Sequence, residues 1–285
     1  MTQMTDVAAP TITRTRRRAR VRSIPEWCAL GYLLLILAIT VLVPVLPLPD
    51  PNTQHLINTL DAPSGEHWLG TDELGRDLLS RLLWAIHTST LAAATAVVVA
   101  FAIGLPLGLL AGYRGGWIDQ VLGRIADAVL IVPALILLLA AQTALDTGIE
   151  GQMVVLGVVF APRVLRVIRT ETIPLAHAPF VVAGRMSGLS HGRILRRYLM
   201  PGVRTQFVVQ FTYLLSLSFV VEAGISFLGI GVQPPDASLG TMLTGASTLL
   251  SYRPWVVVIP ALVLTLLIVS LNVVGDAMNK RAEEK

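Results

Sequence analysis

The sequence is poor in charge and nearly free of cysteine and lysine. Only 14% of its 285 residues are charged, whereas an average soluble domain carries roughly a quarter. So few charges cannot cover the water-facing surface of a fold of this size, which excludes a soluble globular protein and, away from the chain ends, intrinsic disorder. The single cysteine, Cys28, excludes a disulfide scaffold. The composition therefore indicates a membrane protein.

Catalytic and ligand-binding motifs are also missing. The two lysines, Lys280 and Lys285, do not follow a glycine, so the chain has no Gly-x-x-x-x-Gly-Lys phosphate loop. It has no His-Glu-x-x-His motif, and all five histidines precede Ser247, which disfavours an intramembrane serine protease. His55 and His67 share a loop but give only a weak metal signal. We therefore expect no enzymatic activity, no catalytic residues, and no metal or other cofactor bound by this chain.

Long apolar stretches dominate the rest of the sequence, in which 54% of the residues are hydrophobic and the mean hydropathy is +0.69. A bilayer core of about 30 Å needs about 20 apolar residues in a helix, and inside it the backbone must satisfy its own hydrogen bonds. Six stretches qualify, which predicts an all-α integral membrane protein with six transmembrane helices. They lie near residues 28–47, 89–112, 123–144, 151–169, 204–224 and 254–275.

Basic residues fall almost entirely on one side of these spans. Of the 22 Lys and Arg residues, 19 lie on the side of the two chain ends, and only Arg76, Arg81 and Arg253 lie on the other. An excess of positive charge marks the cytoplasmic side, so both termini are expected in the cytoplasm and the protein in the cell membrane. The basic N-terminal tail (1–27) is then a topology signal, which removes the reason to expect a nucleic-acid partner. A short cytoplasmic tail, 277–285, ends the chain.

The connection over residues 48–88 lies outside the membrane in this topology and is acidic. Leucines recur every four residues from Leu74 to Leu82, which predicts an amphipathic helix over 73–86 that lies on the outer membrane surface. Such a helix either only lies on that surface or also forms a rim that guides substrate into a pathway, and the two interpretations are compatible. Its expected N-terminal caps are Thr71 and Asp72.

The connection over residues 170–203 is cytoplasmic and strongly basic. It interrupts a five-helix core over 89–276, and it contains two helical stretches, 180–190 and 192–199. Three glycines spaced four apart would form a bare stripe on a helix, where another backbone can approach closely. Internal packing is the alternative use of such a stripe, but the position of the segment favours a docking element. The glycines are Gly184, Gly188 and Gly192.

Charged residues inside or beside the spans need a reason, because their burial in lipid is costly. Asp127 follows Arg124 by three residues, which predicts an ion pair within one helix. Glu222 lies near the outer end of the fifth span. Its carboxylate either lines a water-filled path or pairs with a neighbour, and both interpretations stay open.

Four stretches carry a resemblance to one family. They are 70–81 (GTDELGRDLLSR), 113–119 (YRGGWID, followed by Arg124, Asp127 and Pro133), 222–235 (EAGISFLGIGVQPP) and 272–276 (NVVGD). In this order they resemble the inner-membrane permease subunits of binding-protein-dependent, ATP-driven importers, in the dipeptide, oligopeptide and nickel branch. The resemblance covers the chain from about residue 25 to 280 and implies the type I importer permease fold.

The resemblance also interprets the cytoplasmic loop as a coupling helix that docks on an ATPase subunit. Ala183 and Gly188 match the family pattern, whereas Val182 replaces the usual acid and Gly184 replaces an alanine. The lost carboxylate removes one possible charge contact with the ATPase subunit. The resemblance then leaves the shape of the loop and its flanking arginines to form the interface. The implied coupling residues are Val182, Ala183, Gly184, Arg185, Gly188, Leu189, Ser190 and Pro201.

As the resemblance implies, the chain forms half of a translocation pathway that Glu222, Ser226 and Phe227 are expected to line. A second homologous permease subunit would supply the other half, two ATP-binding cassette ATPase subunits would hold ATP and magnesium, and an extracytoplasmic solute-binding protein would deliver the substrate. Peptides are the first choice of substrate, and nickel is the alternative. A self-sufficient channel or ion-driven carrier is the competitor from another class, although the span centres lack the charges it would need.

Overall fold

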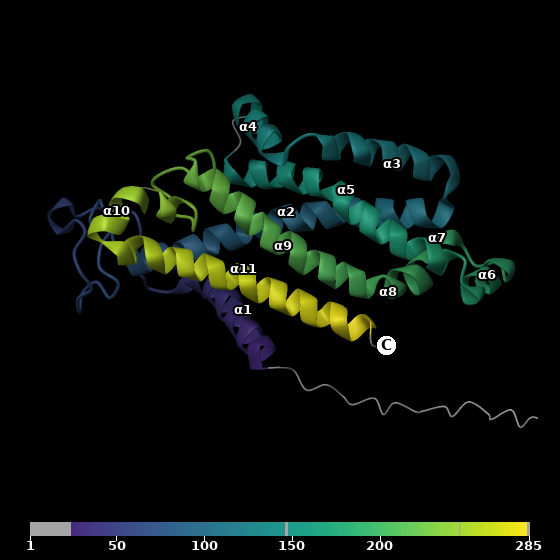
Figure 1. The fold of residues 1–285 in the computed structure, drawn as a ribbon, viewed down its shortest axis with the longest axis horizontal. Helices are drawn as coiled ribbons and strands as arrows, with labels where there is room; N and C mark the ends of the chain where they lie inside the picture. The colour runs from purple at the N-terminus through teal and green to yellow at the C-terminus, as the bar shows by residue number, and fades with distance from the viewer. Residues whose placement is uncertain (1–23, 146–147, 245, 284–285) are drawn as a thin grey trace, which may run out of the picture.

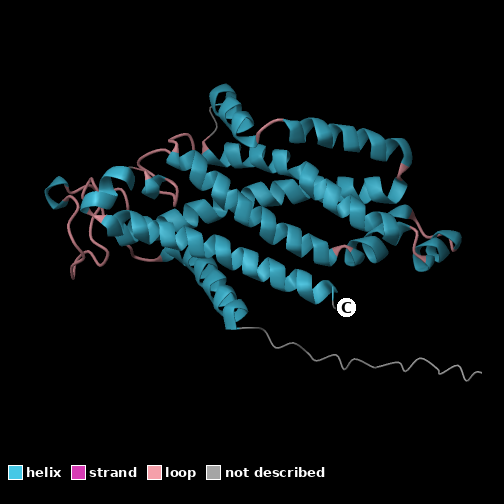
Figure 2. Ribbon diagram, viewed as in Figure 1, coloured by secondary structure: helices cyan, strands magenta, loops and turns pink. Residues whose placement is uncertain are grey.

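The computed structural model describes residues 24–145, 148–244 and 246–283; the rest of the predicted basic tail, 1–23, lies outside them. Within this part of the chain every regular element is a helix, and one isolated bridge joins Thr71 to Asp77 (Figure 2). Five of the described helices are long and apolar enough to cross a membrane. They are α1 (Ile24–Leu42), α2 (Leu78–Arg114), α5 (Ile149–Ala176), α9 (Arg204–Phe227) and α11 (Pro254–Glu283).

The sixth predicted span is a bent pair of helices. α3 (Gly116–Ile131) and α4 (Ala134–Leu145) meet at an angle of 83°. The break falls at Val132, whose backbone is extended with ψ of 126°. Val132 is extended because Pro133 follows it, and a proline ring disfavours a helical backbone in the residue before it. The predicted six spans therefore correspond to five long helices and one bent pair.

Helices α2 and α5 form the most closely packed part of the core. Glycines at every fourth position of α2 bring the two backbones together: a Cβ atom on Gly104 would lie 2.5 Å from the carbonyl oxygen of Ala161, and one on Gly112 would lie 2.6 Å from the Cβ of Thr172. Gly157 of α5 makes the reciprocal approach to α2. Small residues at such a spacing are the usual means of packing helices in a membrane, where apolar burial alone does not bring them together.

The two ends of the bundle carry different loops (Figure 1). The loop over 43–77 and α10 (Ala246–Tyr252) lie at one end, and α6 (Pro179–Met186) lies at the other. We call these the outer end and the inner end, following the topology predicted from the charges.

The prediction of a separate surface helix over 73–86 is wrong. The helix begins at Leu78 and continues without interruption through the second span to Arg114, over 37 residues or about 55 Å. Asp77 is the N-cap in place of Thr71 or Asp72, since its Oδ1 accepts a 2.7 Å hydrogen bond from the Ser80 amide. Leu78 and Leu82 of the leucine repeat lie on the side of α2 that is buried in the bundle, whereas Leu74 precedes the helix and is exposed.

One other local prediction differs from the structure. Asp127 pairs with Arg166 of α5, in place of Arg124 on its own helix. A second ion pair joins Asp119 of α3 to Arg169 of α5, with 2.6 Å between Oδ2 and Nη2. Two ion pairs therefore hold α3 against α5. Helix α11 continues into the expected cytoplasmic tail as far as Glu283.

Candidate functional site

The inner loop presents one short helix with a buried side and an exposed side. α6 begins after Ala178, whose backbone is extended, and Pro179 stands at its first position, where a missing amide costs nothing. Val181 and Gly184 face the protein, whereas Phe180, Val182 and Met186 are 51%, 42% and 85% exposed. Val182 and Met186, one turn apart, therefore form an exposed apolar side of α6, and Phe180 lies on its flank beside Tyr198.

The end of α6 is held by backbone hydrogen bonds around Gly188. The Leu189 amide donates to the Gly184 carbonyl at 3.1 Å, and the Gly188 amide donates to the Arg185 carbonyl at 3.0 Å. This is the Schellman arrangement, which needs a residue with positive φ, and Gly188 has φ of 75°. A Cβ on Gly184 would lie 3.2 Å from Leu189 Cδ1, so the missing side chain there lets Leu189 fold back over the helix end.

The predicted glycine stripe does not exist, because its members do not share a helix. Gly184 lies inside α6, Gly188 forms the turn, and Gly192 belongs to the next helix, α7 (His191–Ile194). A Cβ on Gly192 would meet nothing within 4 Å. The glycines end and redirect the chain, and Gly188 is the one whose conformation requires the absence of a side chain.

The structure gathers most of the predicted coupling residues on α6 and its turn. Val182, Ala183, Arg185, Gly188 and Ser190 are exposed, Leu189 is half-buried and Gly184 is buried. Pro201 lies elsewhere, in the short helix α8 (Met200–Gly202) that follows a π-helical turn over Leu195–Leu199. Their role in coupling stays a prediction.

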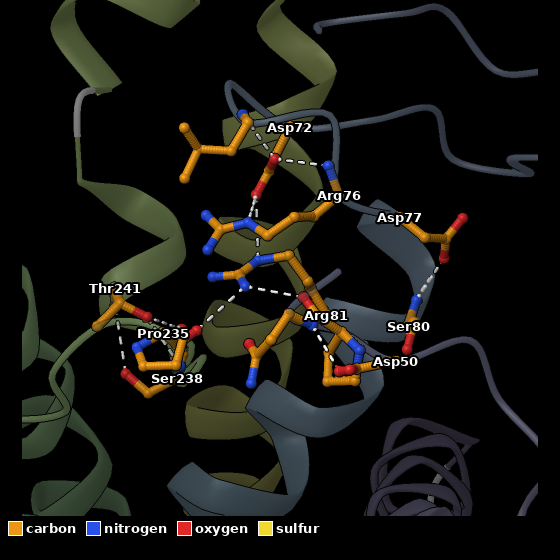
Figure 3. Close-up of polar contacts among 12 residues, drawn as sticks. Asp50, Asp72, Arg76, Asp77, Ser80, Arg81, Pro235, Ser238 and Thr241 are labelled. Carbon is orange, nitrogen blue, oxygen red and sulfur yellow. Dashed lines mark hydrogen bonds and ion pairs between the residues drawn. The ribbon is translucent and has the colours of Figure 1, made fainter. Parts of the chain in front are cut away.

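A buried arginine organises the outer end (Figure 3). Arg81 is 6% exposed. Its Nη1 donates to the carbonyls of Pro51 and Pro235 at 3.1 and 3.3 Å, and its Nε lies 3.2 Å from Asp72 Oδ2. Asp72 also binds Arg76 Nε at 2.7 Å. The Arg81 side chain thus joins α2 to the loop that contains Pro51 and to the loop that contains Pro235. The motif over 70–81 therefore holds these outer loops in place.

Glu222 lies inside the bundle. Its side chain is 0% exposed, and Ser226 donates a 2.9 Å hydrogen bond to its Oε1. The hydroxyl oxygen of Ser226 in turn accepts the Val232 amide, and Ser89 of α2 accepts the Leu239 amide at 3.0 Å. Glu222 thus pairs with a neighbour in a buried cluster, whereas Phe227 is exposed. That these three residues line a pathway stays a prediction.

The outer end also contains a cavity of about 910 Å³ between α2, the start of α5 and the outer loops. Trp84, His87 and Leu91 line it from α2, and Glu150 and Asp236 line it from the other sides. Sequence reasoning missed these residues, because they come together only when α2 and α5 pack. The helical spacing of Trp84, His87 and Leu91 was the one local signal that they share a face.

The described spans define a multi-pass membrane protein. The family model for the inner membrane component of binding-protein-dependent transport systems matches residues 104–284. The chain belongs to this family.

Two relatives that are named as permease proteins of transport systems support this assignment. The chain is 32% identical over 228 residues to the dipeptide transport system permease protein DppC of Alkalihalophilus pseudofirmus, covering 80% of this chain and 75% of that protein. It is 35% identical over 269 residues to the glutathione transport system permease protein GsiD of Escherichia coli O157:H7, covering 94% and 89%.

A solved structure shares the fold. The inward-facing MetNI methionine ABC transporter contains a chain that superimposes with a TM-score of 0.58 at 21% identity, covering 72% of this chain and 97% of that chain. The predicted type I importer permease fold is confirmed by this likeness.

Proposed function

We propose that the chain is the permease subunit of an ATP-driven importer in the cytoplasmic membrane and forms half of a pathway for small peptides. The exposed apolar side of α6 carries this proposal. In water such a surface is costly, and exposed apolar patches mark sites where another protein binds. An ATPase subunit that grips α6 would bury Phe180, Val182 and Met186.

The chemistry of the loop suits an acidic partner with an apolar groove. Val182 cannot offer the usual carboxylate, so its contact with the ATPase is apolar. Exposed arginines flank the helix and would meet acidic residues at the rim of the groove. They are Arg193, Arg196 and Arg197, whereas the guanidinium of Arg185 lies over the Tyr113 ring. Rim charges of this kind mainly choose the partner and its orientation, whereas the apolar centre supplies affinity.

The remaining partners follow from the same function. Two ATPase subunits would hold ATP and magnesium, so this chain binds no cofactor itself. A second homologous permease would complete the pathway, and an extracytoplasmic binding protein would deliver substrate at the outer end. ATPase closure would push α6, and the packed pair α2 and α5 would carry the movement across the membrane.

The substrate is inferred from relatives and from size. The relatives named above transport dipeptides and glutathione, which favours peptides over nickel. The outer cavity of about 910 Å³ falls within the range that holds small ligands, about 300–1,000 Å³. Carboxylates of Glu150 and Asp236 at its lining would suit the amino group of a peptide.

The docking surface is tested with Met186→Asp. A carboxylate placed in an apolar groove loses its hydration without a partner, so we expect about 30-fold weaker retention of the ATPase, the effect of losing a strong interface contact. The readout is the amount of ATPase that co-purifies with the tagged permease. Ile57→Asp is the matched control, since Ile57 is 98% exposed at the outer end. Equal retention in both variants would remove α6 as the docking site.

Transport itself is tested with the complete complex in proteoliposomes. Uptake of a labelled dipeptide that needs both ATP and the binding protein supports the proposal. Uptake by the chain alone, without an ATPase, would instead indicate a self-sufficient channel or carrier.

A further inference from the structure

We propose that Tyr113 is the positioning residue through which the coupling loop holds α2. This inference rests on the proposed function and names the point inside this chain where movement of α6 reaches the spanning helices. Tyr113 lies in the last turn of α2 and is 7% exposed. Its ring and its hydroxyl each contact a different part of the loop.

Both contacts come from the residues that flank the Gly188 turn. The guanidinium carbon of Arg185, near the end of α6, lies 4.5 Å from the centre of the Tyr113 ring, within the range of a cation–π contact. The Tyr113 hydroxyl lies 2.8 Å from Nδ1 of His191, the first residue of α7. Their rings also meet edge to face, with centroids 5.7 Å apart. One buried ring therefore touches the chain on each side of the turn.

Helix α2, which carries Tyr113, is positioned to transmit a movement of the inner loop to α5 and to the outer loops. Gly112, its neighbour, brings the backbone of α2 against Thr172 of α5, so a shift of this turn moves both helices. At the opposite end of the same helix, Ser80 donates to the Pro49 carbonyl at 2.6 Å, and Arg81 binds the outer loops. A displacement of the inner loop through Tyr113 thus reaches the outer loops along one continuous helix.

The two contacts can be removed separately. Tyr113→Phe keeps the ring for Arg185 and removes the hydroxyl that meets His191. Tyr113→Ala removes both contacts. If Tyr113 positions the loop, the first change lowers the number of substrate molecules imported per ATP by about threefold, as expected for one hydrogen bond, and the second lowers it by about tenfold or more.

The measurement uses the full complex in proteoliposomes with its binding protein and a labelled dipeptide. Uptake and ATP hydrolysis are determined together and normalised to the amount of assembled complex, found by size exclusion. His191→Ala and the double change Tyr113→Phe with His191→Ala complete a mutant cycle. Tyr213→Phe is the control, because Tyr213 is exposed on α9, and it should leave the ratio unchanged.

The outcomes separate this inference from the proposed function. The inference is supported if Tyr113→Phe imports fewer substrate molecules per ATP and the double variant has a ratio no lower than that of Tyr113→Phe or His191→Ala alone. A ratio equal to that of the unaltered protein overturns it, and so does a loss of assembled complex at an unchanged ratio, which would make Tyr113 purely structural. If the unaltered complex shows no ATP-driven uptake, the proposed function fails instead.

Discussion

Three charged side chains at the outer end are buried and paired, whereas the arginines around α6 at the inner end are exposed. Arg81, Asp72 and Asp77 have less than a tenth of their surface exposed, and their partners are other parts of the same chain. Around α6 the arginines are exposed, and so are large apolar side chains. Buried charge pairs thus fasten the outer loops to their own chain, whereas the inner loop leaves its arginines exposed on the side where we propose that an ATPase docks.

The largest effect is expected from breaking the buried contacts of the outer loops. Arg81→Ala removes one of the two arginines that pair with the buried carboxylate of Asp72, and it leaves the carbonyls of Pro51 and Pro235 without this donor. We expect a loss of about 3 kcal/mol of stability, the lower end for a broken buried ion pair. Thermal unfolding in detergent measures it. Arg197→Ala, an exposed arginine at the inner end, is the control and should change stability by less than about 0.5 kcal/mol. Equal shifts would show that the outer loops are not held by Arg81.

An intermediate effect is expected at the turn after α6. Gly188→Val forces a branched side chain into a backbone with φ of 75°, at a cost of about 1–2 kcal/mol, so the turn rearranges and α6 loses its fixed direction. We expect the protein to insert normally while ATP hydrolysis continues with little transport. Gly192→Ala is the matched control, because that site has open space. Unchanged transport in Gly188→Val would contradict the role of the turn.

The smallest effect is expected from restoring the family's acid on α6. Val182→Glu places a carboxylate on a half-exposed site, where an ion pair with a partner is worth about 0–1 kcal/mol. Transport per ATP should therefore change by less than about fivefold. The same vesicle assay checks it, with Met186→Asp as the contrasting change. If Val182→Glu abolishes transport per ATP, position 182 lies in the apolar centre of the groove and accepts no carboxylate.

Much of the fold could be read from the sequence because spanning helices obey simple rules. Apolar length located the five long helices, and the motifs indicated the permease fold. The start of α2 was misjudged, since a leucine repeat looks the same on a surface helix and on the buried side of a span. Asp127 was paired with Arg124 because only neighbours along one helix are visible in a sequence, whereas Arg166 comes from another helix.

The residues of the candidate site also divide into those that the sequence indicates and those that only the packed structure brings together. The loop around 180–190 was found from its charge and its match to the family. The glycine stripe was misread, because a spacing of four says nothing about where a helix ends. The positions of Tyr113, Arg81 and Glu222 were beyond sequence reasoning, since their partners lie in other elements.

Composition and charge alone determined that this chain is a membrane bundle and, through the positions of its arginines, which end is expected to face the cytoplasm, because lipid excludes charge from any sequence in the same way. Which charges are buried, where α2 begins and which residues contact Tyr113 depend on how the helices pack. Those contacts join residues as far as 154 positions apart, and their geometry exists only after the helices have packed.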